Sequence, residues 1–432
     1  MAQHPPSPPP GETPPEHRPR ADRRALLTIF VTVLLDLLGF GMILPLLPFY
    51  PQRFGVSELD IGWLFASYSL AQLVFSPLLG RLSDRWGRRP VLLATLALSV
   101  AAHLLFAAAG SFTVLIVARS ASGLAAANLG IAQAFIADVT TRANRSRGMG
   151  MIGAAFGLGF VLGPALGGVL GRWGHVAVPL GAAALALVNL LLALVWLPES
   201  RPREVRRTAP ASAGRWFPGR ALMRLAGERR TAFGLVLLFF VVTFAFAMME
   251  STVALYCQDT FGFGQVQTSW LFVFLGVVMV IVQGGLVGRL TRLLGERRLI
   301  PLGIAAISLG LLLLPLARPP LLGLLLAAPG LLALGLGLHN PSSLGLLSLL
   351  TPEEEQGQTL GLSRSFGALA RVLGPLAGTW LYGSQGIGSP FHAGGFLLLA
   401  ALVAALLLLR RVSDSRGSVA TRRVSPSTVQ PE

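Results

Sequence analysis

The sequence predicts an all-α membrane protein with twelve transmembrane helices in two pseudo-symmetric six-helix bundles. Hydrophobic residues make up 53% of the 432-residue chain and charged residues only 12%, whereas an ordinary soluble domain carries about 25% charged residues. The length accommodates about twelve helices of roughly 20–25 residues with short loops. The formal net charge of +16 is spread over the segments between apolar runs. Nucleic-acid binding is therefore not expected, because it needs a single basic face.

Apolar stretches bounded by turn signals give the individual helices. The expected helices span residues 25–49, 59–79, 91–109, 112–139, 148–171, 176–197, 231–256, 267–290, 299–317, 321–350, 360–382 and 391–409. The proline-rich start predicts a disordered tail. The first apolar run is too long for a signal peptide. The expected divisions are a tail at 1–22, a first bundle at 23–198, a linker at 199–230, a second bundle at 231–410 and a tail at 411–432.

The segment from Gly80 to Pro90, G-R-L-S-D-R-W-G-R-R-P, packs five charges and the helix-breaking Gly87 between two apolar runs. Hydrocarbon cannot hold such a loop, so it must lie in water at one membrane face. Arginines gather in this loop and in every second loop after it, which marks that face as cytoplasmic. We therefore expect a multi-pass protein of the inner (plasma) membrane with both termini in the cytoplasm.

The two halves of the chain look like copies of each other. G-R-L-S-D-R-W-G-R-R at Gly80 recurs as G-R-L-T-R-L-L-G-E-R-R at Gly288, and Gly163-Pro164 recurs as Gly374-Pro375. Parallel repeats related by an axis along the membrane normal are a known plan of secondary transporters. One difference is that Arg292 stands where the first copy has Asp84.

These motifs together resemble the major facilitator superfamily, whose signature loop joins transmembrane helices two and three. L-D-L-L-G-F-G-M-I-L-P-L-L-P, from Leu35, is similar to the first helix of bacterial tetracycline/proton antiporters, and I-A-D at the end of helix four fits that branch. Arg119 and Gly123 resemble the R-x-x-x-G element. The second half, with Glu250 and S-F-G-A-L-A-R, looks closer to eukaryotic tetracycline-transporter-like proteins. Helix five carries a pattern typical of antiporters, G-x-x-x-G-P-x-x-G-G, at Gly159, Gly163, Pro164, Gly167 and Gly168.

The resemblance implies a gating role for the charged loop and its neighbours. Asp84 is expected to face a helix N-terminus, whose dipole favours a carboxylate, and Arg88 to pair with Asp138. In the family these charges latch the two halves in the outward-open state. The alternative is that the loop serves only topology and folding. The expected gating residues are Gly80, Asp84, Arg85, Gly87, Arg88 and Asp138.

Four ionisable residues at membrane depth are candidates for proton or substrate binding. Asp36 lies half-way along helix one, where a charge costs at least ~2.5–3.5 kcal/mol unless it faces a cavity or a partner. Burial disfavours the charged form, which suits a proton-coupled carrier. The alternative is a hydrogen bond that packs the bend at Gly39 and Gly41. Glu250 is expected nearer to the external face, and the same two interpretations, proton binding or a structural hydrogen bond, apply to it.

Arg119 is buried in helix four, and its guanidinium can hold an ionised carboxylate and release it on protonation. A purely structural pairing is the alternative. Arg371 is its rough counterpart in the second half. Together with Arg364 it can draw an anionic substrate, although Arg364 lies near the cytoplasmic end and is expected to pair with a loop or with lipid.

Uncharged polar residues at membrane depth complete the candidates, either as cavity-lining contacts or as interhelical hydrogen bonds. They are Gln72, Asn128, Gln133, Gln283, His339 and Asn340. His103 and Gln258 fall nearer to helix ends and are weaker candidates. The helix-five glycines are expected to allow close packing that seals the cavity, and Pro164 to interrupt the backbone ladder.

Nothing in the sequence indicates an enzyme or a cofactor. The chain has no Walker-type phosphate loop, no H-E-x-x-H and no G-x-S-x-G, and the single Cys257 excludes an intramolecular disulfide and a cysteine-based metal cluster. We predict a carrier that acts as a monomer in the lipid bilayer and exports drug-like or amphiphilic small molecules in exchange for protons. The alternatives are a proton-independent facilitator or importer of an organic anion or metabolite, and a non-transporting receptor or scaffold.

Overall fold

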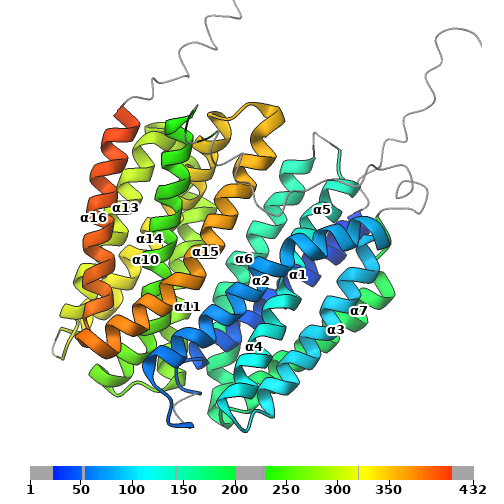
Figure 1. Cartoon of the computed structure of the whole chain (residues 1–432), viewed down its shortest axis with the longest axis horizontal. Helices are drawn as coiled ribbons and strands as arrows, with labels where there is room; N and C mark the ends of the chain where they lie inside the picture. The colour runs from blue at the N-terminus through cyan, green and yellow to red at the C-terminus, as the bar shows by residue number, and fades with distance from the viewer. Residues whose placement is uncertain are drawn as a thin grey trace, which may run out of the picture.

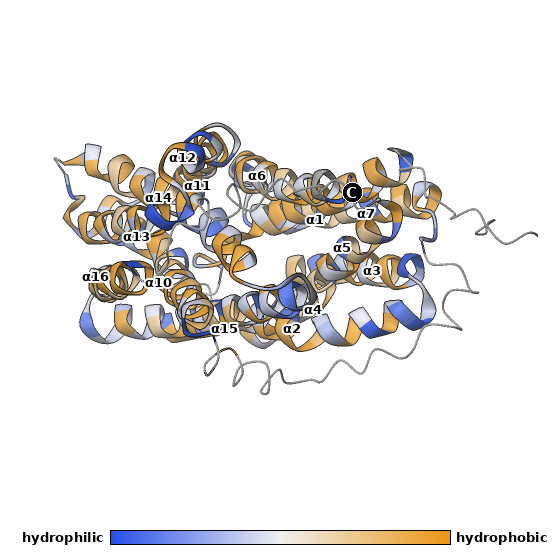
Figure 2. Ribbon diagram, turned by 90° about the horizontal axis from the view of Figure 1, so that it is seen from above, coloured by the Kyte–Doolittle hydropathy of each residue, from blue (hydrophilic) through white to orange (hydrophobic). Residues whose placement is uncertain are grey.

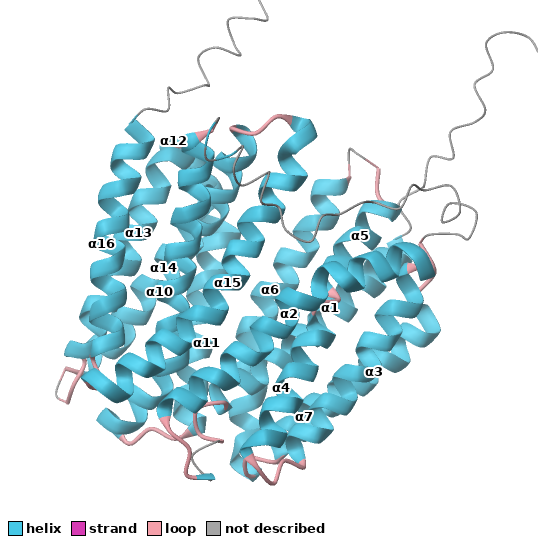
Figure 3. Ribbon diagram, viewed as in Figure 1, coloured by secondary structure: helices cyan, strands magenta, loops and turns pink. Residues whose placement is uncertain are grey.

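A computed structural model describes residues 23–50, 54–141, 144–200, 225, 227, 229–319 and 321–410. Regular structure within these ranges is helical, with short connecting loops (Figure 3). Eleven of the described helical segments are long and apolar enough to cross a membrane. The predicted tails and most of the predicted linker lie outside the described residues.

The first bundle holds the helices before the linker, with α4 and α5 together forming one membrane span. Their bounds are α1 Arg23–Ile43, α2 Glu58–Trp86, α3 Arg88–Ala107, α4 Phe112–Ala126, α5 Leu129–Val139, α6 Arg145–Leu170 and α7 Ala177–Trp196. Short 3-10 turns η1 (Leu44–Leu46) and η3 (Gly171–Trp173) extend α1 and α6. Within this bundle α1 packs on α6 and α7, and α3 packs on α4 and α7.

The second bundle repeats this arrangement after the linker (Figure 1). Its elements are α10 Arg230–Phe261, α11 Gln265–Ile281, the π-helical segment η4 Val282–Leu286, α12 Val287–Leu294, α13 Glu296–Leu313, η5 Leu314–Leu316, α14 Leu322–Leu349, α15 Glu353–Gln385 and α16 Ser389–Arg410. α15 is 33 residues long and packs on α10 and α2. It supplies the twelfth span, with more polar residues than the other eleven. The predicted fold class is confirmed.

The predicted repeat is visible in how equivalent helices touch. A Cβ added to Gly163 would lie 2.8 Å from Cα of Gly41 on α1, and one added to Gly374 would lie 2.7 Å from the side chain of Ala247 on α10. Four residues further on, Gly167 and Gly378 meet α1 and α10 in the same manner. The close packing of α6 on α1 is therefore repeated by α15 on α10.

We name the two ends of the molecule by their glycine turns. The Gly87 face carries the α2–α3 turn and the start of α1, and the Gly174 face carries the α6–α7 turn. The two bundles meet mainly through α2 with α15 and through α6 with α11. Among the closest of these contacts are Gly62 against Pro375 and Gly168 against Ser269. Both pairs lie in the half of the molecule toward the Gly174 face, so this structure is closed on that side.

The outer surface of the two bundles is apolar, as expected for a protein surrounded by lipid. On α16, Phe396, Val403 and Leu407 form one stripe at helical spacing and are 62%, 57% and 58% exposed. Seen along the helix axes, most of the helical surface is hydrophobic (Figure 2). Exposed apolar stripes of this size identify the lipid-facing surface of a multi-pass membrane protein.

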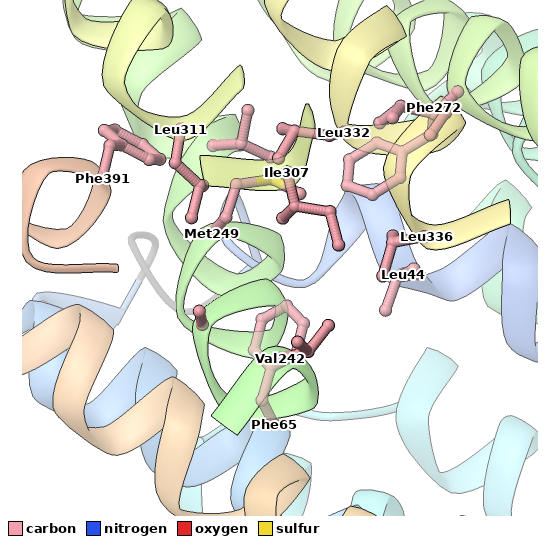
Figure 4. Packing of buried hydrophobic residues seen from close by; sticks show 14 of the residues in the cluster. Leu44, Phe65, Val242, Met249, Phe272, Ile307, Leu311, Leu332, Leu336 and Phe391 are labelled. Atoms are coloured by element: carbon pink, nitrogen blue, oxygen red, sulfur yellow. The ribbon is translucent and has the colours of Figure 1, made fainter. Parts of the chain in front are cut away.

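Small and large apolar side chains fill the interior of each bundle. In the second bundle, Ile307 and Leu311 of α13 pack with Met249 of α10 and Phe391 of α16, all at most 1% exposed (Figure 4). This tight core lets the helices carry polar residues in defined places.

The predicted loop from Gly80 to Pro90 is wrong as a loop, because α2 continues to Trp86 and α3 begins at Arg88. Only Gly87 interrupts the helices, with φ 106°. The charged residues before it are adequate helix formers, and an aqueous interface accommodates their charges without unwinding the backbone. The charge pattern therefore predicted the end of the helix wrongly.

Candidate functional site

Asp36 is held by two asparagine side chains from separate helices. Its Oδ2 accepts a 2.6 Å hydrogen bond from Nδ2 of Asn128, and its Oδ1 accepts a 3.2 Å bond from Nδ2 of Asn189 on α7. Asn189 is fully buried and also donates to the carbonyl of Thr32, at 2.9 Å. An ionised carboxylate accepts hydrogen bonds only, so both amides fit the charged form of Asp36.

Asn128 reaches Asp36 because the predicted fourth helix is not continuous. α4 ends at Ala126 and α5 begins at Leu129, so the single helix expected at 112–139 is wrong at its centre. The break contains no proline; Asn128 and the nearby Gly130 are weak helix formers. The carbonyl of Ala126, at the break, accepts a 3.2 Å hydrogen bond from Nε2 of Gln72 on α2. Gln72 is thus an interhelical contact.

Arg119 lies against an aromatic ring. Its Cζ is 4.5 Å from the ring centroid of Tyr68 on α2, and the residue is 3% exposed. A Cβ on Gly123 would collide with the backbone of Tyr68, so the R-x-x-x-G spacing brings α2 close enough for this stacking. Within the described ranges no carboxylate forms an ion pair with Arg119. Its Nε is buried without a hydrogen-bond partner.

Asp36 and Arg119 line one small pocket inside the first bundle. Its lining residues are Asp36, Phe40, Tyr68, Ser99, His103, Arg119, Ser122, Ala125 and Ala126. His103 is 8% exposed, and its Nδ1 lies 2.7 Å from the carbonyl of Ser99. His103 does lie near the end of α3, as predicted, but it lines the same pocket as Asp36 and was therefore ranked too low as a site residue.

Aromatic rings extend this pocket toward the second bundle. Phe40 lies 5.1 Å from Tyr68 and 6.5 Å from Phe160 of α6, between ring centroids. Glu250 of α10 lies within electrostatic range of both Arg119 and Arg371. Glu250, in the second bundle, is therefore close enough to Arg119, in the first, for their charges to interact.

Glu250 and Asp36 are not equivalent positions of the repeat. Asp36 precedes the packing point of α1 at Gly41, whereas Glu250 follows the packing point of α10 at Ala247. Arg371, near the middle of α15, is solvent-exposed, and within the described part of the chain it makes no ion pair. A charged arginine at that depth requires water beside it.

Arg364 forms a hydrogen bond through Nη1 to Oε1 of Gln133 on α5. The expectation that Arg364 pairs with a loop or lipid is therefore wrong, because the two helices approach across the bundle boundary. Three other predicted residues are not brought to this site by any described contact: Gln283 is exposed in the π-helical segment, His339 is fully buried where α14 meets Gly303 of α13, and Asn340 is half-buried beside it.

At the Gly87 face, Arg88 joins the predicted gating residues. Its Nη2 lies 2.8 Å from Oδ1 of Asp84, and its Nε lies 3.2 Å from Oδ2 of Asp138. Its Nη1 donates a 2.6 Å hydrogen bond to the hydroxyl of the buried Ser83. The predicted Arg88–Asp138 pair is present. Arg88 is 7% exposed, so three groups satisfy a nearly buried guanidinium.

A carboxylate caps the N-terminus of α3, and it belongs to Glu199. The backbone N–H groups of Arg88 and Arg89 donate to Oε1 and Oε2 of Glu199, at 2.9 and 3.3 Å. Ser200 donates a 3.1 Å hydrogen bond to Asp138. The first residues after α7 are therefore tied into the charge cluster around Arg88.

The antiporter pattern lies on α6, the fifth of the predicted transmembrane helices, and its glycines pack against two different helices. A Cβ on Gly159, Gly163 or Gly167 would meet α1 at 2.7–2.8 Å, whereas one on Gly168 would lie 3.0 Å from Cβ of Ser269 on α11. Gly41 packs here as part of a regular helix, against Pro164 and the carbonyl of Gly159. The glycines facing α1 fix the first bundle, and Gly168 serves the boundary between bundles.

Sequence reasoning missed Asn189, Tyr68, Glu199 and Ser200. Asn189 is the one polar residue in the middle of α7, and an amide at that depth was a usable signal. Tyr68 looked like an ordinary aromatic residue of α2. Glu199 and Ser200 appeared to belong to a linker, and no sequence pattern indicates their fold-back onto α3.

The comparisons with known proteins agree with this architecture. A profile described as Major Facilitator Superfamily matches residues 29–320 and 284–431. The class C tetracycline resistance protein of Escherichia coli is 32% identical over 91% of this chain and 98% of its own length. Major facilitator superfamily domain-containing protein 10 of Homo sapiens is 31% identical over 86% of this chain and 91% of its own length.

Solved structures show the same fold. The crystal structure of the human organic anion transporter MFSD10 (TETRAN) is 28% identical, with a TM-score of 0.69 over 91% of this chain and all of that one. A nucleoside transporter, NupG, has the same TM-score at 14% identity, over 89% of this chain and 98% of that one, a likeness of fold alone. With two six-helix bundles, a polar site within the first, and relatives matched over nearly their whole length, the chain belongs to the Major Facilitator Superfamily of membrane transporters.

Proposed function

We propose that this protein is a proton-coupled antiporter that exports drug-like or amphiphilic small molecules by alternating access. The single observation that carries the proposal is the site around Asp36, where a carboxyl group at membrane depth is held by two amides and not by a cation. A carboxylate held in this way can take up and lose a proton without breaking an ion pair. The tetracycline resistance proteins among the relatives support export.

The groups around the site favour an amphiphilic substrate. Tyr68, Phe40 and Phe160 present aromatic surface, and Arg119 and Arg371 present positive charge beside Glu250. Aromatic rings with a few convergent polar groups are typical of small-molecule pockets. A planar compound that carries an acidic or zwitterionic edge would meet both kinds of contact.

Alternating access would move the two bundles relative to each other around this site. The structure is closed toward the Gly174 face, which the arginine distribution predicts to be external. Substrate would enter from the Gly87 face in this state. Protons would arrive from outside after the contacts of α2 with α15 and of α6 with α11 have opened.

Reconstituted protein in liposomes with an imposed pH gradient tests the function directly. Tetracycline is a suitable first probe because of the named relatives, followed by a panel of amphiphilic compounds. We expect substrate movement driven by the gradient and proton movement when substrate is added. Substrate flux that ignores the pH gradient would instead establish a facilitator and overturn the proposed coupling.

Asp36→Asn is the matching variant. We expect it to abolish gradient-driven accumulation and to lose resistance in an efflux-deficient host at equal membrane expression. Glu355→Gln is the control, because Glu355 is an exposed carboxylate paired with Arg229, away from the site. It removes one negative charge without touching the pocket and should transport normally.

A further inference from the structure

The short helix α5 connects three separate polar contacts. At its start, Asn128 donates to Asp36. Near its middle, Gln133 accepts from Arg364 of the second bundle. At its end, Asp138 pairs with Arg88 in the charge cluster of the Gly87 face. α5 has only 11 residues, so a helix about 16 Å long joins the acid site, the other bundle and the gating cluster.

The regular helix is interrupted at both ends of α5. The break at Ala127 and Asn128 separates it from α4, and Thr140, which follows it, is in an extended conformation. The carbonyl of Ala126 is already satisfied by Gln72. A small rotation of α5 therefore costs few backbone hydrogen bonds at its N-terminal end.

A proton on Asp36 would affect its two amide partners differently. Asn189 has a buried Oδ1 that accepts no hydrogen bond, so turning its amide over would let it accept the new carboxyl O–H. Turning the amide breaks its bond to the Thr32 carbonyl, so the side chain of Asn189 would also shift to keep Oδ1 away from that carbonyl oxygen. The bond from Asn128 to Oδ2 of Asp36 would fall from charge-assisted to neutral, roughly halving in strength.

We propose that α5 is the element through which protonation of Asp36 reaches the gating cluster and the second bundle, with Asn128 as the positioning residue. This proposal rests on the proposed proton-coupled function and names the residues that couple the proton to movement. Loss of the charge on Asp36 would loosen the start of α5. Its end would then shift relative to Arg88, and its middle relative to Arg364.

Other ionisable groups also face Asp36 and must be separated from it in the test. They are Tyr68 of α2, His103 of α3 and Arg119 of α4. The helices α5 and α7 present the two asparagines, and α6 presents its glycine surface. His103 is the group whose titration would most resemble that of Asp36, because histidine changes charge in the same pH range.

Hydrogen–deuterium exchange of the full chain in lipid nanodiscs reads the coupling without any substrate. The peptide covering α5 is followed from mildly alkaline to mildly acidic buffer, after correction for the intrinsic pH dependence of exchange. We expect its exchange to rise about threefold on acidification, the factor that corresponds to one membrane hydrogen bond of about 0.6 kcal/mol. Exchange in α7 should stay constant and serves as the internal reference.

Three variants identify the residues involved. Asp36→Asn should fix α5 in the fast-exchanging state at every pH, which also excludes His103 as the source. Asn128→Ala should do the same. Asn189→Ala is the matched control, since it removes the other amide on the same carboxylate, and its α5 exchange should still respond to pH. If Asn128→Ala does not fold, Asp36→Asn alone still tests the link.

Two results would overturn the proposal. One is α5 exchange in the wild type that does not change with pH. The other is an Asn189→Ala variant that loses the response as fully as Asn128→Ala, which would indicate general loosening around Asp36. Transport is measured in parallel on the same preparations. Absence of proton-coupled transport with an intact exchange response would reject the function and leave the coupling of α5 established.

Discussion

The two copies of the repeated glycine turn have the same backbone and different side-chain chemistry. Gly87 lies between α2 and α3 with φ 106° and ψ 158°, and Gly295 lies between α12 and α13 with φ 76° and ψ 158°. In each copy the glycine N–H donates a 3.0 Å hydrogen bond to the residue four positions earlier, Ser83 or Thr291. The turn therefore depends on the glycine and not on the charges around it.

The charges are reversed between the copies. Asp84 and Arg88 form an ion pair in the first, whereas Arg292 and Glu296 occupy the equivalent positions in the second. Arg88 is nearly buried among its partners, but Arg292 is exposed and its Nε reaches a carbonyl of its own helix, at 3.3 Å. The comparison separates a backbone turn, which both copies share, from side-chain contacts that differ between them: Arg88 is nearly buried beside Asp84 and Asp138, whereas Arg292 is exposed.

We expect the largest difference in transport between the two copies when Arg88, the arginine at the centre of the charge cluster, is replaced. Arg88→Gln leaves Asp84 and Asp138 without their cation, so we expect transport to fall at least about tenfold, equivalent to roughly 1.4 kcal/mol. Arg292→Gln in the second copy is the matched variant and should stay within about twofold. Initial transport rates in vesicles, normalised to the amount of protein, measure both. Equal losses in the two variants would contradict the prediction that the charges of the first copy form a gate.

Alanine at the two glycines tests the shared backbone. A residue with a Cβ is strained at these positive φ values by roughly 1–2 kcal/mol, so Gly87→Ala and Gly295→Ala should both lower the thermal stability in detergent by similar amounts. Only Gly87→Ala should also lower transport, because it displaces the nearly buried Arg88. A stability loss at one glycine alone would show that the two turns are not equivalent.

Much of the fold could be predicted because the membrane imposes simple rules. Apolar run lengths located the spans, and the repeat at Gly288 predicted the second turn. The helix ends were less predictable, because arginine, serine and aspartate continue a helix at the aqueous interface, as α2 shows between Gly80 and Trp86. The break at Asn128 was missed because neither proline nor paired glycines mark it.

The site residues were predictable where one side chain alone has a high free-energy cost inside the membrane. Asp36 and Arg119 stand out because a charge at membrane depth requires a partner or water. Their partners were not predictable, since Tyr68 approaches Arg119 only because Gly123 admits the backbone of α2. Glu199 escaped prediction for a different reason: a carboxylate in a linker gives no sign that it will cap α3.

Asp84→Asn should have an intermediate effect within the first copy. The Asp84 side chain is 34% exposed, and ion pairs with exposed partners contribute about 0.2–1 kcal/mol, so we expect transport to fall about two- to fivefold with normal membrane expression. Introducing Asp84→Asn into Arg88→Gln provides the check. The second substitution should then have almost no added effect, because both residues act through one interaction. Full additivity would place the role of Asp84 elsewhere.

The smallest effect is expected from giving the second copy the charges of the first. The double variant Arg292→Asp with Glu296→Arg recreates the order of Asp84 and Arg88, yet the last turns of α14, before Thr351, contain no carboxylate to take the part of Asp138. The new arginine therefore meets one partially exposed partner, and such a pair contributes little. We expect transport within about twofold of wild type, measured beside Arg88→Gln. A large loss would mean that the charge order of the second copy has its own function in the transport cycle, and that the two glycine turns are both gates.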